Sequence, residues 1–267
     1  MKLKAYAKIN IYLKVLGKEN DYHKLKMLNA KINLFDEIEI NESSENELIF
    51  INSNLDPKKD NLVLKIVEYF KEHYKIKKNY KIEITKNIPV MSGLGGGSSD
   101  VAEVIKYLNT NNNLNLSIKE LEKIGLLFGA DIPYCLHNEP CIVEGIGEIV
   151  IPTDVIKEYK EKDIIVVNPK IELSTKDVFE TFDKLEMVKS DIVLFKTNDL
   201  EEAAIKLNPE ILKAKKYLID NFNENIVMSG SGSSFIILTD KDKSNYIYNK
   251  IKKEKEWFVS INQILEV

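Results

Sequence analysis

The chain has 267 residues, of which 44% are hydrophobic and 30% are charged, a composition typical of folded globular proteins and unlike that of disordered chains. Its 38 basic and 42 acidic residues give a net charge of −4, and the lysines are dispersed along the chain, which argues against nucleic acid as a partner. No apolar run approaches the length of a membrane span and the first residues form no leader, so we expect a cytoplasmic protein without a membrane partner.

The first expected element is a strand over residues 4–17, where apolar and polar residues alternate. One face would be buried and would carry Ala5, Ala7, Ile9, Ile11, Leu13 and Val15. On the other face, Lys8 and Asn10 are two residues apart, so their side chains should lie about 7 Å from each other and can share a site. A lysine exposed to solvent is the simpler interpretation, but the neighbours Tyr6 and Tyr12 make this an unusual surface.

The next elements alternate between sheet and helix. The patterns predict strands over 32–43 and 47–53, an amphipathic helix over 61–74, and a strand over 80–90 that leads into a glycine-rich loop.

The loop "GLGGGSSD" holds four glycines in five positions and passes directly into a helical pattern. Glycine is favoured where the backbone has a positive φ or lies against a ligand. Exposed N–H groups followed by a helix N-terminus form an anion site, so a nucleotide phosphate is the expected ligand. A Walker A loop would end in Gly-Lys-Ser/Thr, and a dinucleotide-binding loop would have glycine where the serines stand, so both fit poorly. A flexible loop without a ligand is the structural alternative.

A second helix is expected over 117–131, with a capping box at its start and a glycine near its end. Asp131 follows the helix at a corner where Pro133 should hold Ile132 extended. Such a corner can aim a carboxylate at a reacting group. An aspartate that merely caps the turn is the simpler alternative.

Two cysteines, Cys135 and Cys141, flank His137 and Glu139, which raises a metal site as a hypothesis. Zinc sites usually show tighter cysteine pairs and a fourth ligand at a recognisable spacing. We therefore expect ordinary half-buried residues, with both cysteines present as thiols.

The remaining pattern predicts strands within 140–152 and 163–169, and a helix–helix–strand–strand order in the region after residue 153. The restart of the pattern places a domain boundary there. The expected domains are an ATP-binding domain over 1–153 and a C-terminal domain over 154–267.

Several short motifs together resemble the superfamily of galactokinase, homoserine kinase, mevalonate kinase and phosphomevalonate kinase. The stretch "PVMSGLGGGSSDVA" resembles its phosphate-binding motif, "AKINIYL" its first motif and "MSGSGSS" its third. With "DYHKLKML", "GADIPYCL" and "VEGIGE", the set is most similar to the branch that phosphorylates the 2-hydroxyl of 4-diphosphocytidyl-2-C-methyl-D-erythritol in non-mevalonate isoprenoid biosynthesis. The resemblance runs from about residue 6 to residue 234.

This resemblance implies a two-domain α+β fold of the small-molecule kinase type, with mixed sheets packed against helices and the active site in the cleft between domains. It also implies ATP and Mg²⁺ as cofactors and a small-molecule substrate with a cytidine diphosphate moiety, and it leaves the oligomeric state open. One alternative is a sister kinase of the homoserine or mevalonate type, which should lack the Tyr22-His23 pair. Another is a catalytically silent nucleotide-binding module, which should lack Lys8 or Asp131.

The resemblance also implies roles for individual residues. Asp131 would be the catalytic base, and Lys8 would contact both the reacting hydroxyl and the base. The implied ATP-binding residues are Asn61, Leu62, Pro89, Gly93, Leu94, Gly95, Gly96, Gly97, Ser98 and Ser99, and either serine could also meet Mg²⁺. The implied substrate-binding residues are Asn10, Tyr22, His23, Thr175, Phe179, Gly230, Ser231 and Gly232.

Within the substrate set, Tyr22 and Phe179 would stack on the cytosine while His23 bonds to its edge. The sequence departs from the family pattern at Asp21, where glycine is usual, and at Met91 and Ser92 in the phosphate loop. These departures concern loop conformation more than chemistry.

Overall fold

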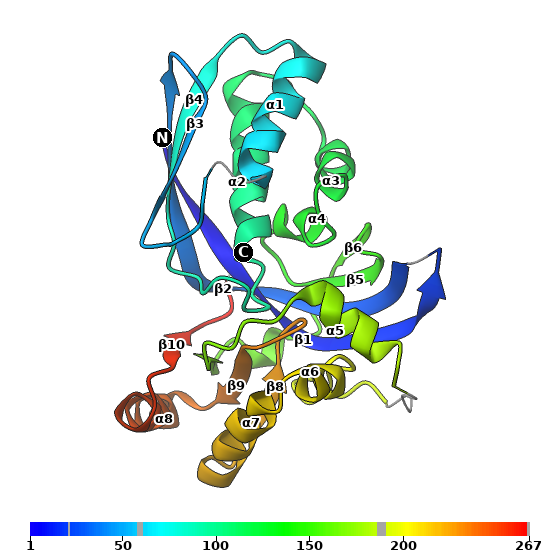
Figure 1. The fold of residues 1–267 in the computed structure, drawn as a ribbon, viewed down its shortest axis with the longest axis vertical. Helices are drawn as coiled ribbons and strands as arrows, with labels where there is room; N and C mark the ends of the chain where they lie inside the picture. Colours follow the sequence, from blue (N-terminus) through cyan, green and yellow to red (C-terminus); the bar gives the residue numbers. More distant parts are fainter. Residues whose placement is uncertain (21, 58–60, 186–190, 266–267) are drawn as a thin grey trace. The chain divides into compact units, whose positions relative to one another are not determined.

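The computed structural model describes residues 1–20, 22–57, 61–185 and 191–265 (Figure 1). The chain forms two compact units, each assembled from separate stretches. The first unit comprises Met1–Ala7, Leu34–Ile88 and Gly95–His137, and the second comprises Lys8–Asn33, Pro89–Leu94 and the chain from Asn138 onward. Neither unit begins or ends at residue 153 or 154. The domains expected from the sequence, 1–153 and 154–267, therefore stay a prediction.

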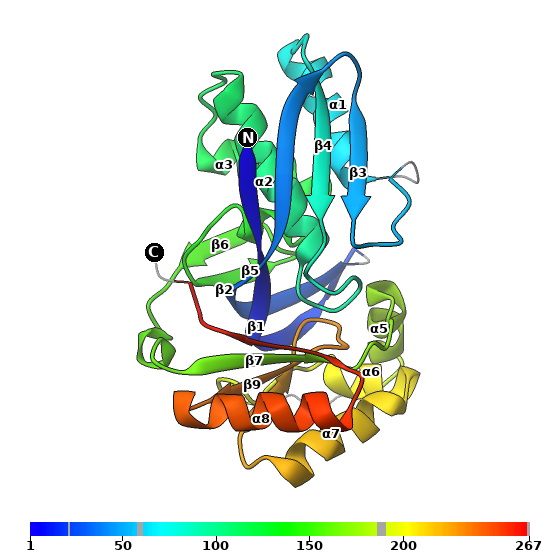
Figure 2. The ribbon, with the colours of Figure 1, turned by 90° about the vertical axis from the view of Figure 1, so that its left-hand side faces the viewer.

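In its described residues, the first unit combines a sheet with four helices. Its strands are the start of β1 (Lys2–Glu19), the end of β2 (Tyr22–Ser43), β3 (Glu47–Ile51) and β4 (Asn79–Thr85). β4 lies between β2, to which it is antiparallel, and β3, to which it is parallel. The helices are α1 (Leu62–Tyr74), α2 (Gly96–Asn111), α3 (Ile118–Leu126) and α4 (Ile132–Cys135). Figure 2 shows α1 and α2 on one face of this sheet. Apolar residues of its strands, such as Ile38, Ile40, Ile82 and Ile84, are buried.

The second unit contains the other halves of β1 and β2 and a separate four-stranded sheet. β2 pairs antiparallel with β5 (Cys141–Gly145), which pairs antiparallel with β6 (Ile149–Pro152). The separate antiparallel sheet has the order β10-β7-β9-β8, with bounds Phe258–Asn262, Asp163–Asn168, Phe235–Thr239 and Asn225–Met228.

The part of the second unit that the structure describes also contains four helices and a short 3₁₀ turn. They are η1 (Lys157–Tyr159), α5 (Thr175–Phe182), α6 (Glu201–Leu207), α7 (Glu210–Asn221) and α8 (Lys241–Glu254). α7 contacts β8, and α8 contacts β7 and β10, so one face of this sheet is covered by helices (Figure 2). The expected helix–helix–strand–strand order is wrong, because three helices precede β8 and a further helix and strand follow β9. Helices as short as α5 and α6 span too few turns to show a clear period.

The first strand confirms one expectation and corrects another. All six apolar positions from Ala5 to Val15 are buried, as their alternation predicts. The opposite face was expected to be open, but Lys8 is only 3% exposed, Asn10 1% and Lys14 4%. A strand buried on both faces that carries lysine and asparagine on one of them needs polar partners inside the protein. The polar side chains of that face are therefore candidates for a functional site.

Other local expectations are confirmed. The predicted capping box at α3 is present, since the Ser117 side chain accepts from the Glu120 N–H and the Glu120 carboxylate accepts from the Ser117 N–H. None of the helices within the described ranges is both long and apolar enough to cross a bilayer.

Candidate active site

Three sequence motifs that are far apart in the chain meet in the second unit. The Lys8 N–H donates to the Leu94 carbonyl at 2.9 Å. The Asn10 N–H donates to Ser229 Oγ at 3.2 Å, and Ser229 Oγ in turn donates to the Gly93 carbonyl at 3.1 Å. The first strand, the start of the glycine loop and the "MSGSGSS" segment are thus tied together by one serine hydroxyl.

Two glycines at this junction are required by the packing of the protein itself. Gly93 has a φ of +76°, and a Cβ there would lie 2.1 Å from the Ser229 carbonyl oxygen. Gly230 has a φ of +58°, and a Cβ there would lie 3.0 Å from the Gly93 carbonyl oxygen. Each glycine is explained by positive φ and close backbone approach, without any ligand.

Asn198, which was not predicted from the sequence, supports the "MSGSGSS" segment by hydrogen bonds. Its Nδ2 donates to the carbonyls of Met228 at 2.7 Å and Gly230 at 2.8 Å, and its Oδ1 accepts from the Leu200 N–H at 2.9 Å. A lone asparagine between two helical segments offers no signal from which this role could have been predicted.

Lys8 and Asn10 lie on the same face of β1, as their spacing predicts, and their side chains are in contact. Lys8 Nζ donates to Asn10 Oδ1 at 3.0 Å, and Asn10 Nδ2 donates to Asn29 Oδ1 at 2.7 Å. Asn29, also missed, is fully buried on β2, and its Nδ2 has no hydrogen-bond partner within the described part of the chain. The two bonds fix the orientation of the Asn10 amide, so that its oxygen faces the lysine.

The second half of the glycine loop belongs to the first unit and starts α2. Gly95 is the N-cap residue, with a φ of +67°, and α2 begins at Gly96, two residues earlier than the sequence suggests. Gly96 and Gly97 do not have positive φ, so backbone conformation does not explain why either position is glycine. Instead, Gly96 lies against Ile88, whose Cγ2 would be 3.1 Å from a Cβ.

Gly97 differs from all these glycines. It lies in the first turn of α2 without a positive φ, and a Cβ built on it would meet no atom within 4 Å among the described residues beyond its own helix backbone and chain neighbours. Glycine destabilises a helix by about 1 kcal/mol relative to alanine. The fold gives no reason for glycine at this position.

The two serines after Gly97 are not equivalent. Ser99 is buried, and its hydroxyl donates to the Tyr6 carbonyl at 2.7 Å. Ser98 is half-buried in the first turn of α2. Ser98 is therefore the better placed of the two to offer a hydroxyl to an external ligand.

A buried ionic cluster, also missed from the sequence, holds the start of α2 against the sheet. Lys86 Nζ donates to Asp36 Oδ2 and, at 2.6 Å, to Asp100 Oδ2. Asp36 Oδ1 accepts from the N–H groups of Asn87 at 2.5 Å and Ile88 at 2.8 Å. Burial raises the pKa of Asp100 to about 7, against the opposing effect of Lys86.

Asp131 lies at the turn that leads into α4, and this turn differs from the expected one. It precedes α4 with φ −84° and ψ −16°, and its side chain does not cap that helix. The expectation that Pro133 holds Ile132 extended is wrong, because Ile132 is the first residue of α4. Proline is tolerated there, since the N–H groups of the first helical turn have no intrahelical partner. Asp131 is half-buried and lies in the first unit, whereas Lys8 lies in the second.

The candidate pyrimidine residues lie in the second unit and are only partly brought together. The rings of His23 and Phe179 stack, with centroids 4.6 Å apart, and Thr175 Oγ1 lies 2.9 Å from Ser231 Oγ. Tyr22 is 63% exposed, so the structure gives no evidence that its ring is part of a platform. Gly232 has a φ of +89° and packs against Met228.

The remaining ATP-side candidates have structural explanations of their own. Asn61 Oδ1 caps α1 by accepting from the Val63 N–H at 2.8 Å, and Leu62 is the first residue of that helix. Pro89 is half-buried, and its carbonyl accepts from the Ser92 hydroxyl at 2.5 Å. Met91 adopts a φ of +51° and is half exposed, while Asp21 lies outside the described residues.

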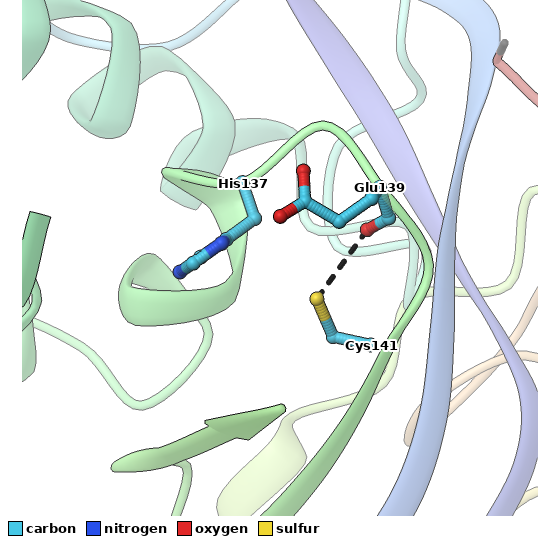
Figure 3. A group of neighbouring side chains, drawn as sticks. All are labelled: His137, Glu139 and Cys141. Carbon is cyan, nitrogen blue, oxygen red and sulfur yellow. Dashed lines mark hydrogen bonds between the residues drawn. The ribbon is translucent and has the colours of Figure 1, made fainter. Parts of the chain in front are cut away.

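The stretch His137–Cys141 carries the side chains considered as metal ligands (Figure 3). His137 Nε2 lies 2.7 Å from Glu122 Oε1, and Cys141 Sγ donates to the Glu139 carbonyl at 3.4 Å. The boundary between the two units falls directly after His137, and we assign no metal site to this stretch. Cys135 and Cys141 are thiols, as expected, but both are fully buried rather than half-buried.

Comparison with known proteins gives consistent matches over the whole chain. A family model for the GHMP kinases N terminal domain matches residues 61–139, and one for GHMP kinases C terminal matches residues 179–256. A 4-diphosphocytidyl-2-C-methyl-D-erythritol kinase of Clostridium beijerinckii is 38% identical, over 97% of this chain and 99% of the relative. One of Clostridium perfringens is 35% identical, over 90% of this chain and 89% of the relative.

Solved structures show the same fold at lower identity. A crystal structure of 4-(cytidine 5'-diphospho)-2C-methyl-D-erythritol kinase matches with a TM-score of 0.80 and 24% identity, over 98% of this chain and 99% of that one. The mevalonate kinase of Methanococcus jannaschii matches with a TM-score of 0.71 and 16% identity, over 100% of this chain and 98% of that one.

Proposed function

The chain belongs to the family of 4-diphosphocytidyl-2-C-methyl-D-erythritol kinases within the GHMP kinases, and we propose that it transfers the γ-phosphoryl group of ATP to the 2-hydroxyl of 4-diphosphocytidyl-2-C-methyl-D-erythritol. This reaction belongs to the non-mevalonate route to isoprenoid precursors. The alternatives are a sister kinase of the homoserine or mevalonate type and a catalytically silent nucleotide-binding module.

The observation that supports a phosphate site is the presence of glycine at position 97. A glycine at helical φ, with open space where a Cβ would point, lowers helix stability and serves no packing purpose. It is explained if a phosphate group approaches the backbone N–H groups at the start of α2, where the helix dipole also favours negative charge. Alanine would place a methyl group in that space.

Mg²⁺ fits this loop as an ion held mainly by the nucleotide. Mg²⁺ usually keeps several waters and is bound by substrate phosphates with one or two protein oxygens. The Ser98 hydroxyl is a suitable protein ligand, whereas the Ser99 hydroxyl is already bonded to the Tyr6 carbonyl. When bound, Mg²⁺ would neutralise charge on the phosphates.

We assign the acid–base chemistry to Asp131. Its carboxylate takes the proton of the substrate 2-hydroxyl as that oxygen bonds to the γ-phosphorus, and the bond from the γ-phosphorus to the bridging oxygen breaks to leave ADP. Lys8 supplies positive charge near the reacting oxygen, and the Asn10 amide, itself held by Asn29, keeps the ammonium in place.

The cytosine site is assigned to the group around His23 in the second unit. An imidazole nitrogen can recognise the polar edge of a base, and an aromatic ring such as that of Phe179 or Tyr22 can support its face. Thr175 and Ser231, which are bonded to each other, offer hydroxyl groups on the same unit.

The test is ATP turnover with purified protein and three acceptors in parallel: the cytidine diphosphate substrate, mevalonate and homoserine. The proposal predicts rapid ADP release only with the first acceptor. Preferred use of mevalonate or homoserine would support a sister kinase. ATP binding without turnover of any of the three would support the silent module.

A further inference from the structure

The ring of His23 contacts three side chains within the second unit. Its face stacks on Phe179, with an interplanar angle of 24°, and its edge meets the ring of Phe182, with centroids 6.0 Å apart. Its Nε2 lies 2.5 Å from Asp183 Oδ1. The His23 side chain is only 10% exposed, so these contacts leave it little freedom to rotate.

Asp183 is an unusual residue for its place in the fold. It is the C-cap residue of α5, and its N–H donates to the Phe179 carbonyl one turn earlier. Residues four apart lie on one face of a helix, which explains how Phe179 and Asp183 reach the same imidazole. A carboxylate at a helix C-terminus is unfavourable to the helix dipole, so local helix stability does not account for it.

Asp183 is held as an anion that can only accept hydrogen bonds. Lys18 Nζ lies 2.6 Å from its Oδ2. The hydrogen bonds from Lys18 and from His23 keep the pKa of Asp183 below its ordinary value, against the effect of burial. The His23 nitrogen that faces it must therefore carry a proton.

The proton on Nε2 of His23 determines the role of the other ring nitrogen, Nδ1. When the imidazole is neutral, one nitrogen donates and the other accepts, so a proton on Nε2 then makes Nδ1 an acceptor. Among the described residues, the hydrogen bond of the His23 ring to Asp183 uses Nε2 and not Nδ1. An acceptor matches the exocyclic amino group of cytosine and opposes the carbonyl oxygen that uracil has in its place.

We propose that Asp183 is a positioning residue for substrate specificity: it fixes His23 in the Nε2–H tautomer, so that Nδ1 selects cytidine diphosphate over uridine diphosphate substrates. This inference rests on the proposed function, because it assumes that His23 faces the base. Asp183 acts through His23 and touches neither ATP nor the reacting hydroxyl.

The direct test is the His23 tautomer, read by ¹⁵N chemical shifts of protein labelled at histidine. The chain has only three histidines, so assignment by His23→Gln is straightforward. Wild type should show protonated Nε2 and unprotonated Nδ1, and Asp183→Ala should show a mixture of tautomers. A wild-type ring protonated at Nδ1, either alone or together with Nε2, or an unchanged ring in the variant, would overturn the proposal whatever the substrate is.

The functional test compares kcat/KM for the cytidine substrate and its uridine analogue. Asp183→Ala should lower the cytidine-to-uridine ratio at least tenfold, through KM for the acceptor, and should leave KM for ATP unchanged. Asp177→Ala is the matched control, since it removes an exposed carboxylate from the first turn of the same helix. Its ratio should equal that of wild type.

The two tests separate failure of the inference from failure of the proposed function. If the tautomer shifts in Asp183→Ala but the base preference does not, the specificity role is wrong and the kinase assignment stands. If wild type turns over neither diphosphate, the proposed function fails, and with it the specificity role, while the tautomer result still reports the His23–Asp183 contact.

Discussion

Gly93 and Gly97 lie four residues apart and are glycines for different reasons. A side chain at Gly93 would collide with the Ser229 carbonyl, so the folded chain itself excludes it. A side chain at Gly97 would project into open space. The sequence alone shows only a glycine-rich loop and cannot distinguish the two, because the atoms that exclude a Cβ at Gly93 come from a segment more than 130 residues away.

Gly97→Ala should therefore affect folding and binding in opposite directions. Removing glycine from the first turn of α2 should raise the free energy of unfolding by up to about 1 kcal/mol. The added methyl group should weaken ATP binding roughly tenfold or more, as it occupies the space assigned to phosphate. Denaturant titration and calorimetry measure the two effects.

Gly93→Ala is the control for this experiment and should destabilise the fold, because the backbone around Ser229 cannot give way easily. Wild-type ATP affinity in Gly97→Ala would remove the main support for a phosphate at α2.

Asp131→Asn should keep the fold and ATP binding but lose turnover, since an amide of nearly the same shape cannot take a proton. The expected loss in kcat is on the order of 10²–10⁴-fold. Steady-state kinetics, with nucleotide binding measured on the same sample, checks both statements. A variant that keeps more than about a tenth of the wild-type kcat would rule Asp131 out as the general base.

At the scale of elements, much of the structure follows from local pattern. The apolar face of β1 and the capping box of α3 are visible in the sequence, because each depends on residues a few positions apart. The burial of Lys8 and Asn10 was not predictable, since polar residues on alternate positions normally mark a solvent face. Asp183 was missed for a similar reason, because its partner His23 is 160 residues away.

The ionic cluster at the start of α2 leads to a prediction about pH. Folded Asp100 has a pKa of about 7, whereas an unfolded aspartate titrates near 3.9. Between these values the folded state binds the extra proton, so the contribution of Asp100 to stability is present at low pH and is lost as pH rises through about 7.

The free energy of unfolding of wild type, compared with Asp100→Asn, should therefore fall between pH 5 and pH 8. The relative loss should be at least about 1 kcal/mol, since one unit of pKa difference corresponds to about 1.4 kcal/mol. Chemical denaturation at several pH values provides the data. Asp220→Asn, at an exposed aspartate of α7, should show no such trend, and a flat difference for Asp100→Asn would mean that this carboxyl titrates normally.

At the scale of the whole molecule, the motifs that predicted the family are spread over most of the chain, and the structure shows that three of them meet. Lys8, Gly93 and Ser229 come from three distant segments and meet within one unit. The proposed base, Asp131, and the start of α2 belong to the other unit. The sequence motifs predict candidate site residues, whereas the supports provided by Asn29, Asn198 and Asp36 depend on contacts that only the folded chain creates.

The measurement that tests the central claim most directly is ³¹P NMR of the product formed from ATP and 4-diphosphocytidyl-2-C-methyl-D-erythritol. The 2-hydroxyl is carried by a carbon that bears a methyl group and no hydrogen. A phosphate on that oxygen should therefore give a new phosphomonoester singlet without three-bond coupling to hydrogen, while the diphosphate signals remain. A doublet or triplet for the new phosphomonoester would place the phosphate on another hydroxyl, and no new signal would contradict the proposed reaction altogether.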